Sequence, residues 1–346
     1  MKKVSVIGLF CIGREVSDGQ SVKTRIVTDE LEKILGAECV DRIDTYRWKK
    51  KPFRLLCRSA SAVWNSRNVI FMTDAGGIRV FPWLLNLANI FGRTRVHYVV
   101  IGGWLVPFLK EHRCLAACLK RLSGIFVETR VMKRGLEQMG FGNVHLMPNC
   151  KRLNRLTEKQ LIRGREEPLR FCIFSRVMKE KGIEDAVEAV KAANAHFGRT
   201  ACTLDIFGPV DPGETDWFQT LSGSFPQEIR YCGIVPYEQS VETVKAYDAL
   251  LFPTRFYTEG IPGTIIDAYA AGVPVVASRW ESFGDIVEEG VTGIGYPFGD
   301  ADRLTRILQD LIRSPENLLA MKKNCLRKSE EYLPEQVIGI LLNELY

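Results

Sequence analysis

The sequence predicts an α/β protein with two doubly wound domains, each built on a parallel sheet. Its 346 residues are enough for two domains of roughly 100–200 residues each. Short apolar runs alternate with segments of helical period along the chain, which is typical of parallel α/β sheets. The charge also divides at mid-chain. Residues 1–150 hold 24 Lys and Arg against 12 Asp and Glu, whereas residues 151–346 hold 23 against 29.

The first predicted domain, residues 1–150, begins with an apolar run and continues as an alternation of strands and helices. The predicted strands are KVSVIGL, NVIFM, RVHYVVIG, GIFVE and NVHLMP. A helix is predicted over 19–35, where one face collects Val22, Ile26, Val27, Leu31, Ile34 and Leu35. This order of elements predicts a Rossmann-like domain.

A linker and a second Rossmann-like domain follow. Residues 151–168 are polar and charged and end in a proline, so they predict a linker. Residues 169–333 repeat the pattern, with LRFCIFS, CTLDIFG, IRYCG, ALLFP and VPVVAS as strands. The segment 315–346 predicts two further helices. With two such domains, a cleft between them is the expected ligand site.

Composition excludes several classes of protein. Apolar residues make up 46% of the chain and charged residues 25%, which excludes a disordered or fibrous chain. No run approaches the roughly 20 apolar residues of a membrane span. The ten cysteines form no CxxC pair, and no His/Cys/carboxylate cluster suggests a metal. We therefore expect a cytoplasmic protein without a metal. The basic first half fits an anionic substrate, a membrane, a nucleic acid or simply a solvated basic surface.

The stretch FPTRFYTEGIPGTIIDAYAAGVPVVAS, residues 252–278, predicts an anion site. A strand ends at Phe252, Pro262 suits the first position of a helix, and Gly272 supplies its C-terminal cap before a strand that starts at Val273. The amides at the start of this helix are expected to be unpaired and aimed at a diphosphate. They belong to Gly263, Thr264 and Ile265.

Two acids and two bases surround this predicted anion site. Glu259, next to Gly260, precedes the helix, and Asp267 lies one turn inside it, so both carboxylates can accept hydrogen bonds from sugar hydroxyls. Alternatively, Glu259 only offsets the helix dipole and Asp267 is a solvated helix residue. Arg176 and Lys181 flank the loop after the first strand of this domain, where two cations can clamp a diphosphate. The alternative is two surface charges.

Five motifs in this half resemble those of retaining glycosyltransferases of family four, which have the GT-B fold. They are SRVMKEKGIEDAVEAV, TLDIFGPVD, IRYCGIVP, TEGIPGTIIDAYAAGVPVVAS and EEGVTGIGYP, in the family's order over residues 169–310. In the first half, DGQSVKTRIVTDEL, which includes Gly19, resembles the family's glycine-rich first loop and helix. The resemblance also implies that the final helix, within 334–346, crosses back to the first domain.

The resemblance implies a role for each matched position. Glu259 would contact the transferred sugar, and Asp267 the ribose, where the family usually has Glu. Arg176 and Lys181 would bind the diphosphate. The main chain of Gly233, Ile234 and Val235 would meet the base.

One departure lies in the first domain. Many members of the family have a His near the donor sugar, but this chain has VIGGWL at 100–105, and His97 falls inside the preceding strand. The turn at Gly102, Gly103 and Trp104 lets an acceptor sugar or lipid approach the backbone and stack on the indole. A tight turn with a core Trp is the alternative.

The segment 47–67, RWKKKPFRLLCRSASAVWNSR, interleaves basic and apolar residues. This pattern predicts peripheral contact with an anionic bilayer, and the alternative is an ordinary surface helix. A formal DxD at Asp300–Asp302 precedes a predicted helix, and helix capping explains it.

These observations predict a metal-independent, retaining glycosyltransferase without a cofactor. It would move a sugar from a nucleotide-diphosphate sugar, with UDP as the expected nucleotide, to a lipid-diphosphate or saccharide acceptor in surface polysaccharide or glycolipid assembly. No nucleic acid is expected as a partner, and peripheral attachment to the inner face of the plasma membrane stays open. The alternatives are a sugar-nucleotide epimerase on the same fold and a non-catalytic protein that binds nucleotide sugars.

Overall fold

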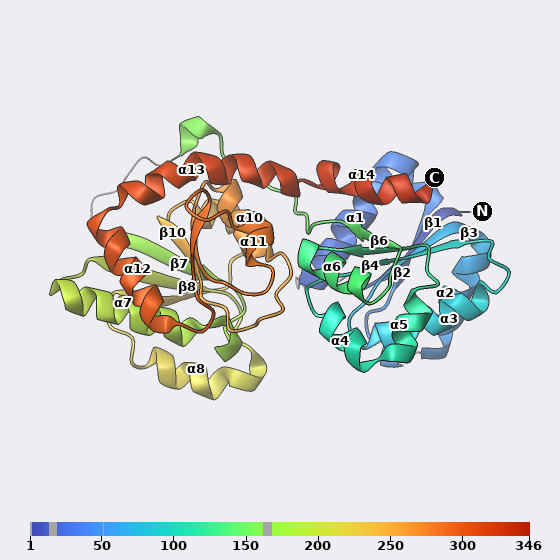
Figure 1. The fold of residues 1–346 in the computed structure, drawn as a ribbon, viewed down its shortest axis with the longest axis horizontal. Coiled ribbons are helices and arrows are strands. Elements are labelled where there is room, and N and C mark those ends of the chain that lie inside the picture. Colours follow the sequence, from blue (N-terminus) through green and yellow to red (C-terminus); the bar gives the residue numbers. More distant parts are fainter. Residues whose placement is uncertain (1, 14–18, 51, 162–167) are drawn as a thin grey trace. The chain divides into compact units, whose positions relative to one another are not determined.

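The chain folds into two compact units, each built on one parallel six-stranded sheet (Figure 1). The structure is a computed structural model that describes residues 2–13, 19–50, 52–161 and 168–346. The first unit comprises the residues up to Arg152 together with Tyr332–Tyr346, and the second is Leu153–Glu331. The prediction of two doubly wound α/β sheets is confirmed. Within the described ranges, no helix is long and apolar enough to cross a membrane.

The sheet of the first unit has the strand order β2-β1-β3-β4-β5-β6, with all neighbours parallel. Its strands are β1 (Lys2–Gly8), β2 (Val40–Asp44), β3 (Ser66–Met72), β4 (Arg95–Val99), β5 (Gly124–Val127) and β6 (Val144–Leu146). Its helices are α1 (Gly19–Leu35), α2 (Pro52–Asn65), α3 (Phe81–Ala88), α4 (Leu105–Glu111), α5 (Arg113–Leu119), α6 (Arg130–Gln138) and α14 (Pro334–Leu345). Every predicted strand of this half is present.

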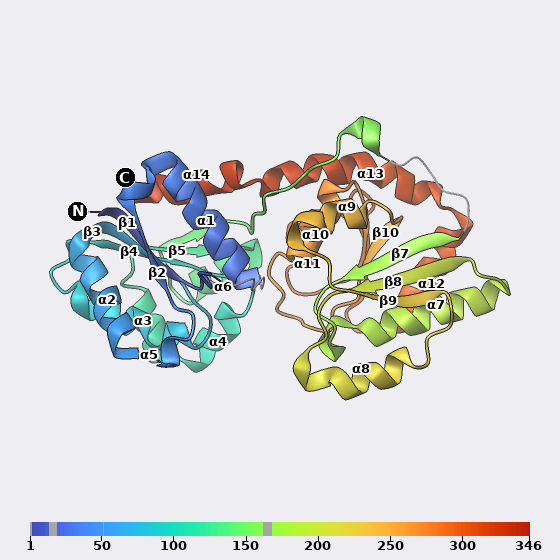
Figure 2. The same ribbon diagram turned by 180° about the vertical axis from the view of Figure 1, so that it is seen from behind.

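Helix α1 packs on this sheet and on the last helix of the chain. Ile26, Val27 and Leu31 are buried as predicted, but Ile34 is half exposed because it lies at the edge of the apolar face. Helix α14 lies beside α1 in both views (Figures 1 and 2). Its Val337, Ile338, Leu341 and Leu345 enter the same core cluster as the buried residues of α1. Residues from the two ends of the sequence therefore share one core.

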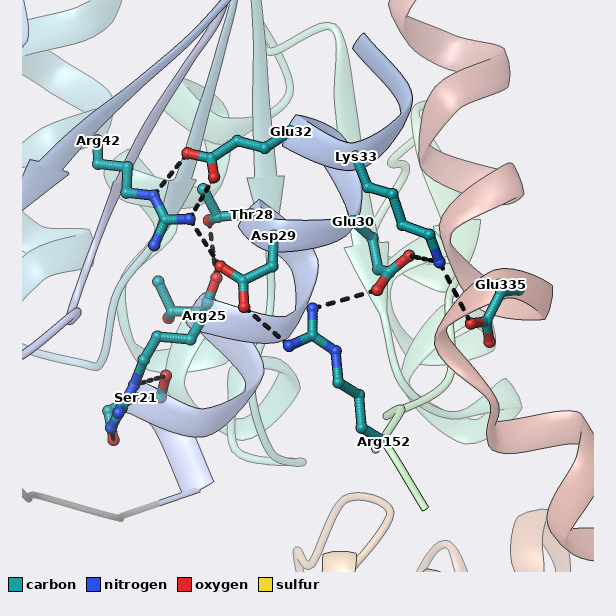
Figure 3. A network of polar contacts seen from close by, with 11 residues as sticks. Ser21, Arg25, Thr28, Asp29, Glu30, Glu32, Lys33, Arg42, Arg152 and Glu335 are labelled. Carbon is teal, nitrogen blue, oxygen red and sulfur yellow. Dashed lines mark hydrogen bonds and ion pairs between the residues drawn. The ribbon is translucent and has the colours of Figure 1, made fainter. Parts of the chain in front are cut away.

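A polar network covers the outer side of α1 (Figure 3). Arg42 of β2 binds Asp29 at 2.6 Å and Glu32 at 2.5 Å, and these hydrogen bonds raise its pKa above the usual range. Arg152, the last residue of this part of the first unit, binds Asp29 at 3.0 Å and Glu30 at 3.2 Å. The network therefore ties α1 to a strand on one side and to the end of the first chain segment on the other.

The sheet of the second unit has the order β12-β11-β10-β7-β8-β9. Its strands are β7 (Leu169–Phe174), β8 (Cys202–Phe207), β9 (Ile229–Gly233), β10 (Ala249–Phe252), β11 (Val275–Ser278) and β12 (Gly293–Tyr296). Its helices are α7 (Ile183–Phe197), α8 (Thr215–Ser222), α9 (Ser240–Val244), α10 (Gly263–Ala270), α11 (Phe283–Ile286), α12 (Ala301–Arg313) and α13 (Glu316–Lys328). Strand β11 begins at Val275 rather than at the predicted Val273, because Val273 still bonds back to Ala268 at the end of α10.

The predicted linker is partly packed rather than wholly free. From Leu153 on, its described residues belong to the second unit, where Leu156 is buried and its amide donates to the carbonyl of Ala270 at 3.0 Å. Residues 162–167 of the predicted linker lie outside the described residues. The chain therefore passes from one unit to the other just after Arg152.

Candidate functional site

The candidate site lies where the strand order of the second sheet reverses. From β7 the chain adds β8 and β9 on one side, then returns to add β10, β11 and β12 on the other. Strands β7 and β10 are parallel neighbours, with Phe171 opposite Ala249. Their carboxyl ends therefore meet at one edge, and in doubly wound folds ligands bind at this switch point.

A pocket of about 350 Å³ opens at that edge. Its lining residues come from the loop after β7 and from the loop after β10: Arg176, Met178, Glu180, Lys181, Phe256 and Glu259. The structure thus brings together the three residues predicted to act on the sugar diphosphate, although 83 positions separate the first from the last in the sequence.

Lys181 and Glu259 form an ion pair across this pocket. Their side chains are 21% and 13% exposed, so solvent screens the pair less than it screens a surface pair. The Thr254 hydroxyl also donates to the Glu259 carboxylate, at 3.2 Å. The ammonium group of Lys181 lies 6.0 Å from the centre of the Phe256 ring, within the range of a cation–π contact. Glu259 is therefore held by side chains and does more than offset a helix dipole.

Arg176 is more exposed than Lys181 and is held loosely. Its guanidinium lies 3.6 Å from the carboxylate of Asp211, and its side chain is about half exposed. It therefore presents an exposed positive charge in the lining of the pocket, where it can pair with an anionic ligand.

Two glycines allow the loops to approach closely enough to form this site. A Cβ on Gly182, which has φ +68°, would lie 1.8 Å from the carbonyl oxygen of Pro253, next to β10. A Cβ on Gly208, which has φ +131°, would lie 1.9 Å from the carbonyl oxygen of Ser175, next to Arg176. Both positions need glycine because of positive φ and because the backbone of a neighbouring loop fills the space.

Helix α10 begins at Gly263, four residues after Glu259 of this pocket. Within the described ranges, the Gly263 and Thr264 amides have no acceptor, and the buried Thr264 hydroxyl has no partner. The prediction for Ile265 is wrong. Its amide donates to the carbonyl of Pro262 at 3.1 Å, because the first turn of the helix tightens there. Two amides and one hydroxyl are therefore left for an anion.

Asp267 is buried, with 2% of its surface exposed. This excludes the alternative in which it is a solvated helix residue. It lies in the second turn of α10, after the residues of the anion site. A buried carboxylate must be compensated by hydrogen bonds or by an opposite charge, so the surroundings of Asp267 have to provide such groups.

The remaining residues predicted to bind the donor lie away from this pocket. Gly233 ends β9 with φ +77°, and Ile234 after it is exposed, at the same edge of the sheet but two strands from β7. Val235 follows, and Gly260 lies in the loop before α10. Gly19 is the exposed first residue of α1 in the first unit, and the loop residues 14–18 lie outside the described residues.

The turn at Gly102, Gly103 and Trp104, which was predicted to meet the acceptor, is closed by the indole of Trp104 itself. Gly102 has φ +81°, and the Trp104 indole N–H donates to the carbonyl of Ile101 at 2.9 Å. The ring packs edge-on against Phe108, with centroids 5.3 Å apart. These contacts favour the tight turn over a free stacking platform, and Gly103 within the turn is buried.

Sequence analysis missed a buried ion pair in the first unit. The Lys23 ammonium group lies 2.6 Å from the Glu128 carboxylate, and both side chains are almost completely buried. Lys23 also donates to the carbonyl of Val100 at 3.1 Å, just before the Gly102 turn. The sequence carried one signal of this buried pair: Lys23 lies four residues before Val27 and therefore on the apolar face of α1.

The DxD motif is explained by capping. The Asp300 carboxylate accepts a hydrogen bond from the Arg303 amide at 2.9 Å, which caps α12. Among the residues that the structure describes, no group of three or more His, Cys, Asp or Glu is placed to hold a metal ion.

Comparison with solved structures defines the class of the fold. Anabaena HepE in complex with UDP matches with a TM-score of 0.77 and 14% identity, over 100% of this chain and 99% of that one. The same protein in complex with UDP-glucose matches with a TM-score of 0.74 and 15% identity, over the same shares of both chains. The chain therefore has the two-domain GT-B fold of glycosyltransferases.

The sequence of the second unit also matches known proteins. Residues 168–314 match the family model described as glycosyl transferases group 1. The amylovoran biosynthesis glycosyltransferase AmsK of Erwinia amylovora is 27% identical over 146 residues, 41% of this chain. The putative colanic acid biosynthesis glycosyltransferase WcaL of Salmonella typhimurium is 28% identical over 158 residues, 44% of this chain. The matches span 35% and 38% of these relatives' own lengths.

Proposed function

We propose that the chain is a retaining, metal-independent glycosyltransferase that uses a nucleotide-diphosphate sugar. The observation that carries the proposal is the pocket at the strand-order switch, where Arg176, Lys181 and Glu259 meet. The nearby amino end of α10 adds two amides without acceptors among the described residues. Cations and amides suit a diphosphate, and a carboxylate suits the hydroxyls of a sugar.

Each group would then have a distinct task. Arg176, Lys181 and the α10 amides stabilise the negative charge that grows on the diphosphate as it leaves. Glu259 accepts hydrogen bonds from the transferred sugar, and Asp267 accepts them from the ribose. The main chain at Gly233–Val235 contacts the base.

The proposed reaction breaks one bond and forms another at the anomeric carbon. The carbon–oxygen bond to the diphosphate breaks, and both electrons stay on the diphosphate oxygen. The acceptor hydroxyl oxygen bonds to the anomeric carbon on the same face, which retains the configuration. Its proton moves to the departing diphosphate oxygen, so no base from the protein is required.

Relatives support the choice of donor and acceptor. HepE structures contain UDP and UDP-glucose, which supports a UDP-sugar donor. AmsK and WcaL are named for surface polysaccharide biosynthesis, which supports a saccharide or lipid-linked acceptor. We place the reaction at the inner face of the plasma membrane, where lipid-diphosphate acceptors are available.

The test is incubation of the chain with a panel of radiolabelled nucleotide sugars and native membranes. We expect label to move from one UDP-sugar into a lipid or polysaccharide fraction, with and without chelator. The Lys181→Ala variant should lose this transfer, whereas Arg306→Ala, an exposed change on α12, should keep it. Conversion of the donor into a different nucleotide sugar without acceptor would indicate an epimerase. Tight donor binding without turnover would indicate a non-catalytic binding protein.

A further inference from the structure

Helix α2 carries apolar side chains on its outer face as well as on its inner face. Leu55 and Val63 are buried against the first sheet. Phe53 and Trp64, eleven residues apart and therefore on one side of the helix, are 80% and 69% exposed. A helix that is apolar on both faces is unusual on a protein surface that only meets water.

Helix α3 and the turn after it have the same property. Phe81 and Leu85 are buried, whereas Trp83, Leu87 and Phe91 recur at a four-residue spacing on the exposed side. Ile90 is exposed beside them. Of the sixteen large apolar side chains that are exposed among the described residues, six lie between residues 53 and 91. Such a concentration marks an interaction surface rather than scattered apolar residues.

The two helices present these side chains on one continuous surface. A hollow of about 270 Å³ is lined by Val63 and Trp64 at the end of α2 and by Ala88 and Phe91 at the end of α3. Arg93 also lines it. Trp64 and Phe91 therefore border the same depression, and the exposed stripes of the two helices meet there.

The charge around this surface has one sign. Residues 45–110 contain eleven Lys and Arg but a single acid, Asp74. The Asp74 carboxylate already accepts hydrogen bonds from the amides of Gly76 and Gly77. Arg54, Arg67 and Arg93 are exposed and form no ion pair within the part of the chain that the structure describes. Within this segment of the chain, an anionic partner would therefore meet many more cations than the single carboxylate.

We propose that this surface docks the chain on an anionic lipid bilayer. We call it the α2–α3 face, and it consists of Phe53, Trp64, Trp83, Leu87, Ile90 and Phe91 with Arg54, Arg67 and Arg93. It extends the predicted contact at 47–67 to a second helix that the sequence did not indicate. Trp and Phe insert at the boundary between headgroups and acyl chains, while Arg side chains reach the phosphates.

A bilayer explains both the apolar residues and the arginines of the α2–α3 face better than other anionic partners do. Nucleic acid would use the arginines and the aromatic rings but would gain nothing from the exposed side chains of Leu87 and Ile90. A bilayer buries the apolar stripes and attracts the cations at the same time. The inference adds a partner to the proposed function, but it rests on residues of the first unit only and not on the sugar-diphosphate pocket.

The experiment measures co-sedimentation of the full chain with sucrose-loaded vesicles. One set contains about one-third phosphatidylglycerol in phosphatidylcholine, and the other contains phosphatidylcholine alone. We expect at least about tenfold stronger partitioning onto the anionic vesicles, falling when NaCl rises from about 0.05 M to about 0.5 M. Trp64→Gln with Phe91→Gln should weaken partitioning by about tenfold or more. Arg54→Gln with Arg93→Gln should weaken it by about 25-fold, at roughly fivefold for each charge.

The matched control is Ile34→Gln with Leu319→Gln, which removes two exposed apolar side chains outside the α2–α3 face. It should partition like the original chain, and all variants should keep the same circular dichroism spectrum. Equal partitioning of all variants, or none onto anionic vesicles at low salt, would overturn the proposal. Self-association that the Trp64 and Phe91 changes abolish, without vesicle binding, would also overturn it.

The same variants separate this proposal from the proposed function. Turnover of nucleotide sugar with a water-soluble acceptor should be unchanged in Trp64→Gln with Phe91→Gln. Vesicle binding without any sugar transfer would leave the docking face intact and reject the enzyme. Sugar transfer without vesicle binding would support the enzyme and reject the docking face.

Discussion

Arg152 and Arg155 lie three positions apart in the chain but are anchored in different units. Arg152 binds Asp29 and Glu30 of α1 at 3.0 and 3.2 Å. Arg155 donates to the Ser329 hydroxyl at 2.7 Å, to the Leu326 carbonyl at 2.9 Å and to the Glu330 carboxylate at 2.8 Å, all in the second unit. The covalent connection between the units is therefore only a couple of residues long at this crossing.

This relationship predicts separable effects of the two arginines on stability. Arg155→Ala should destabilise the second unit by about 1–3 kcal/mol, because its side chain is only 24% exposed and its three hydrogen bonds would be lost. Arg152→Ala should cost the first unit at most about 1 kcal/mol, because its side chain is 51% exposed. Hydrogen exchange followed by mass spectrometry assigns each loss to a unit. Equal losses in both units for either variant would contradict the anchoring.

The cations of the pocket should act on the chemical step. We expect Arg176→Ala and Lys181→Ala each to lower kcat by roughly 10²–10³, as when a preorganised contact to a leaving group is removed. Steady-state kinetics with the donor identified by the panel gives the measurement, and Arg306→Ala serves as the control. Normal turnover by both pocket variants would place the diphosphate elsewhere.

The two acids should separate sugar recognition from nucleotide recognition. Glu259→Gln should impair transfer and leave the affinity for bare UDP nearly unchanged, because it removes a contact to the sugar alone. Asp267→Asn should weaken UDP binding itself by a few kcal/mol at most. Calorimetric titration with UDP, with and without EDTA, measures both effects. The opposite pattern would reverse the assignment of sugar and ribose.

The buried His97 predicts a loss of stability at acid pH. Burial, and to a smaller extent the charge of Arg95, lowers the pKa of His97 to about 4 from an ordinary 6.5. As the pH falls from 6.5 to 4, the unfolded chain binds a proton there that the folded chain does not. The free energy of unfolding should therefore fall by up to about 3 kcal/mol over this interval from His97 alone.

Urea unfolding at pH 7, 6 and 5 measures this dependence. His97→Gln should flatten it, because the side chain no longer titrates, whereas His112→Gln, at the partly exposed end of α4, should leave it unchanged. An identical pH dependence in the original chain and in His97→Gln would show that other groups control acid stability.

The last helix should be essential to the first unit. Val337, Ile338, Leu341 and Leu345 are buried in its core, so deletion of residues 334–346 would expose surface worth roughly 6–12 kcal/mol, which is comparable to the whole stability of a typical domain. The milder Leu341→Ala should cost about 2–5 kcal/mol, and Asn343→Ala on the exposed side should cost little. Chemical denaturation measures both. A truncated chain of normal stability would show that the segment is dispensable.

Sequence patterns predicted the parts of this protein that depend on local order. The predicted strands were recognised as short apolar runs in the sequence, and Pro262 and Gly272 marked the two ends of α10. The convergence of Arg176, Lys181 and Glu259 was predicted because the ends of parallel strands share an edge. Ile265 was misjudged because a tightened first turn cannot be seen in residue types.

Features that depend on distant contacts were not predictable in the same way. Glu128 follows a strand and Lys23 lies in a helix, and nothing in either segment of the sequence indicates that these two side chains form an ion pair. Exposure is also a tertiary property. The run FPWLLNLANIFG carried no prediction of a site, because sequence alone does not show which of its apolar side chains the sheet leaves uncovered.

The first unit is built from two separated stretches of chain, and this fixes the order in which the protein can mature on the ribosome. Residues 153–331 are continuous and can complete their own sheet as soon as they emerge. Most of the first unit emerges earlier, but its core stays incomplete until residues 332–346 have left the exit tunnel, because these residues cover the apolar side of α1. A chain truncated after residue 331 should therefore hold a folded second unit and an incomplete first one. The half of the protein made first would be the half finished last.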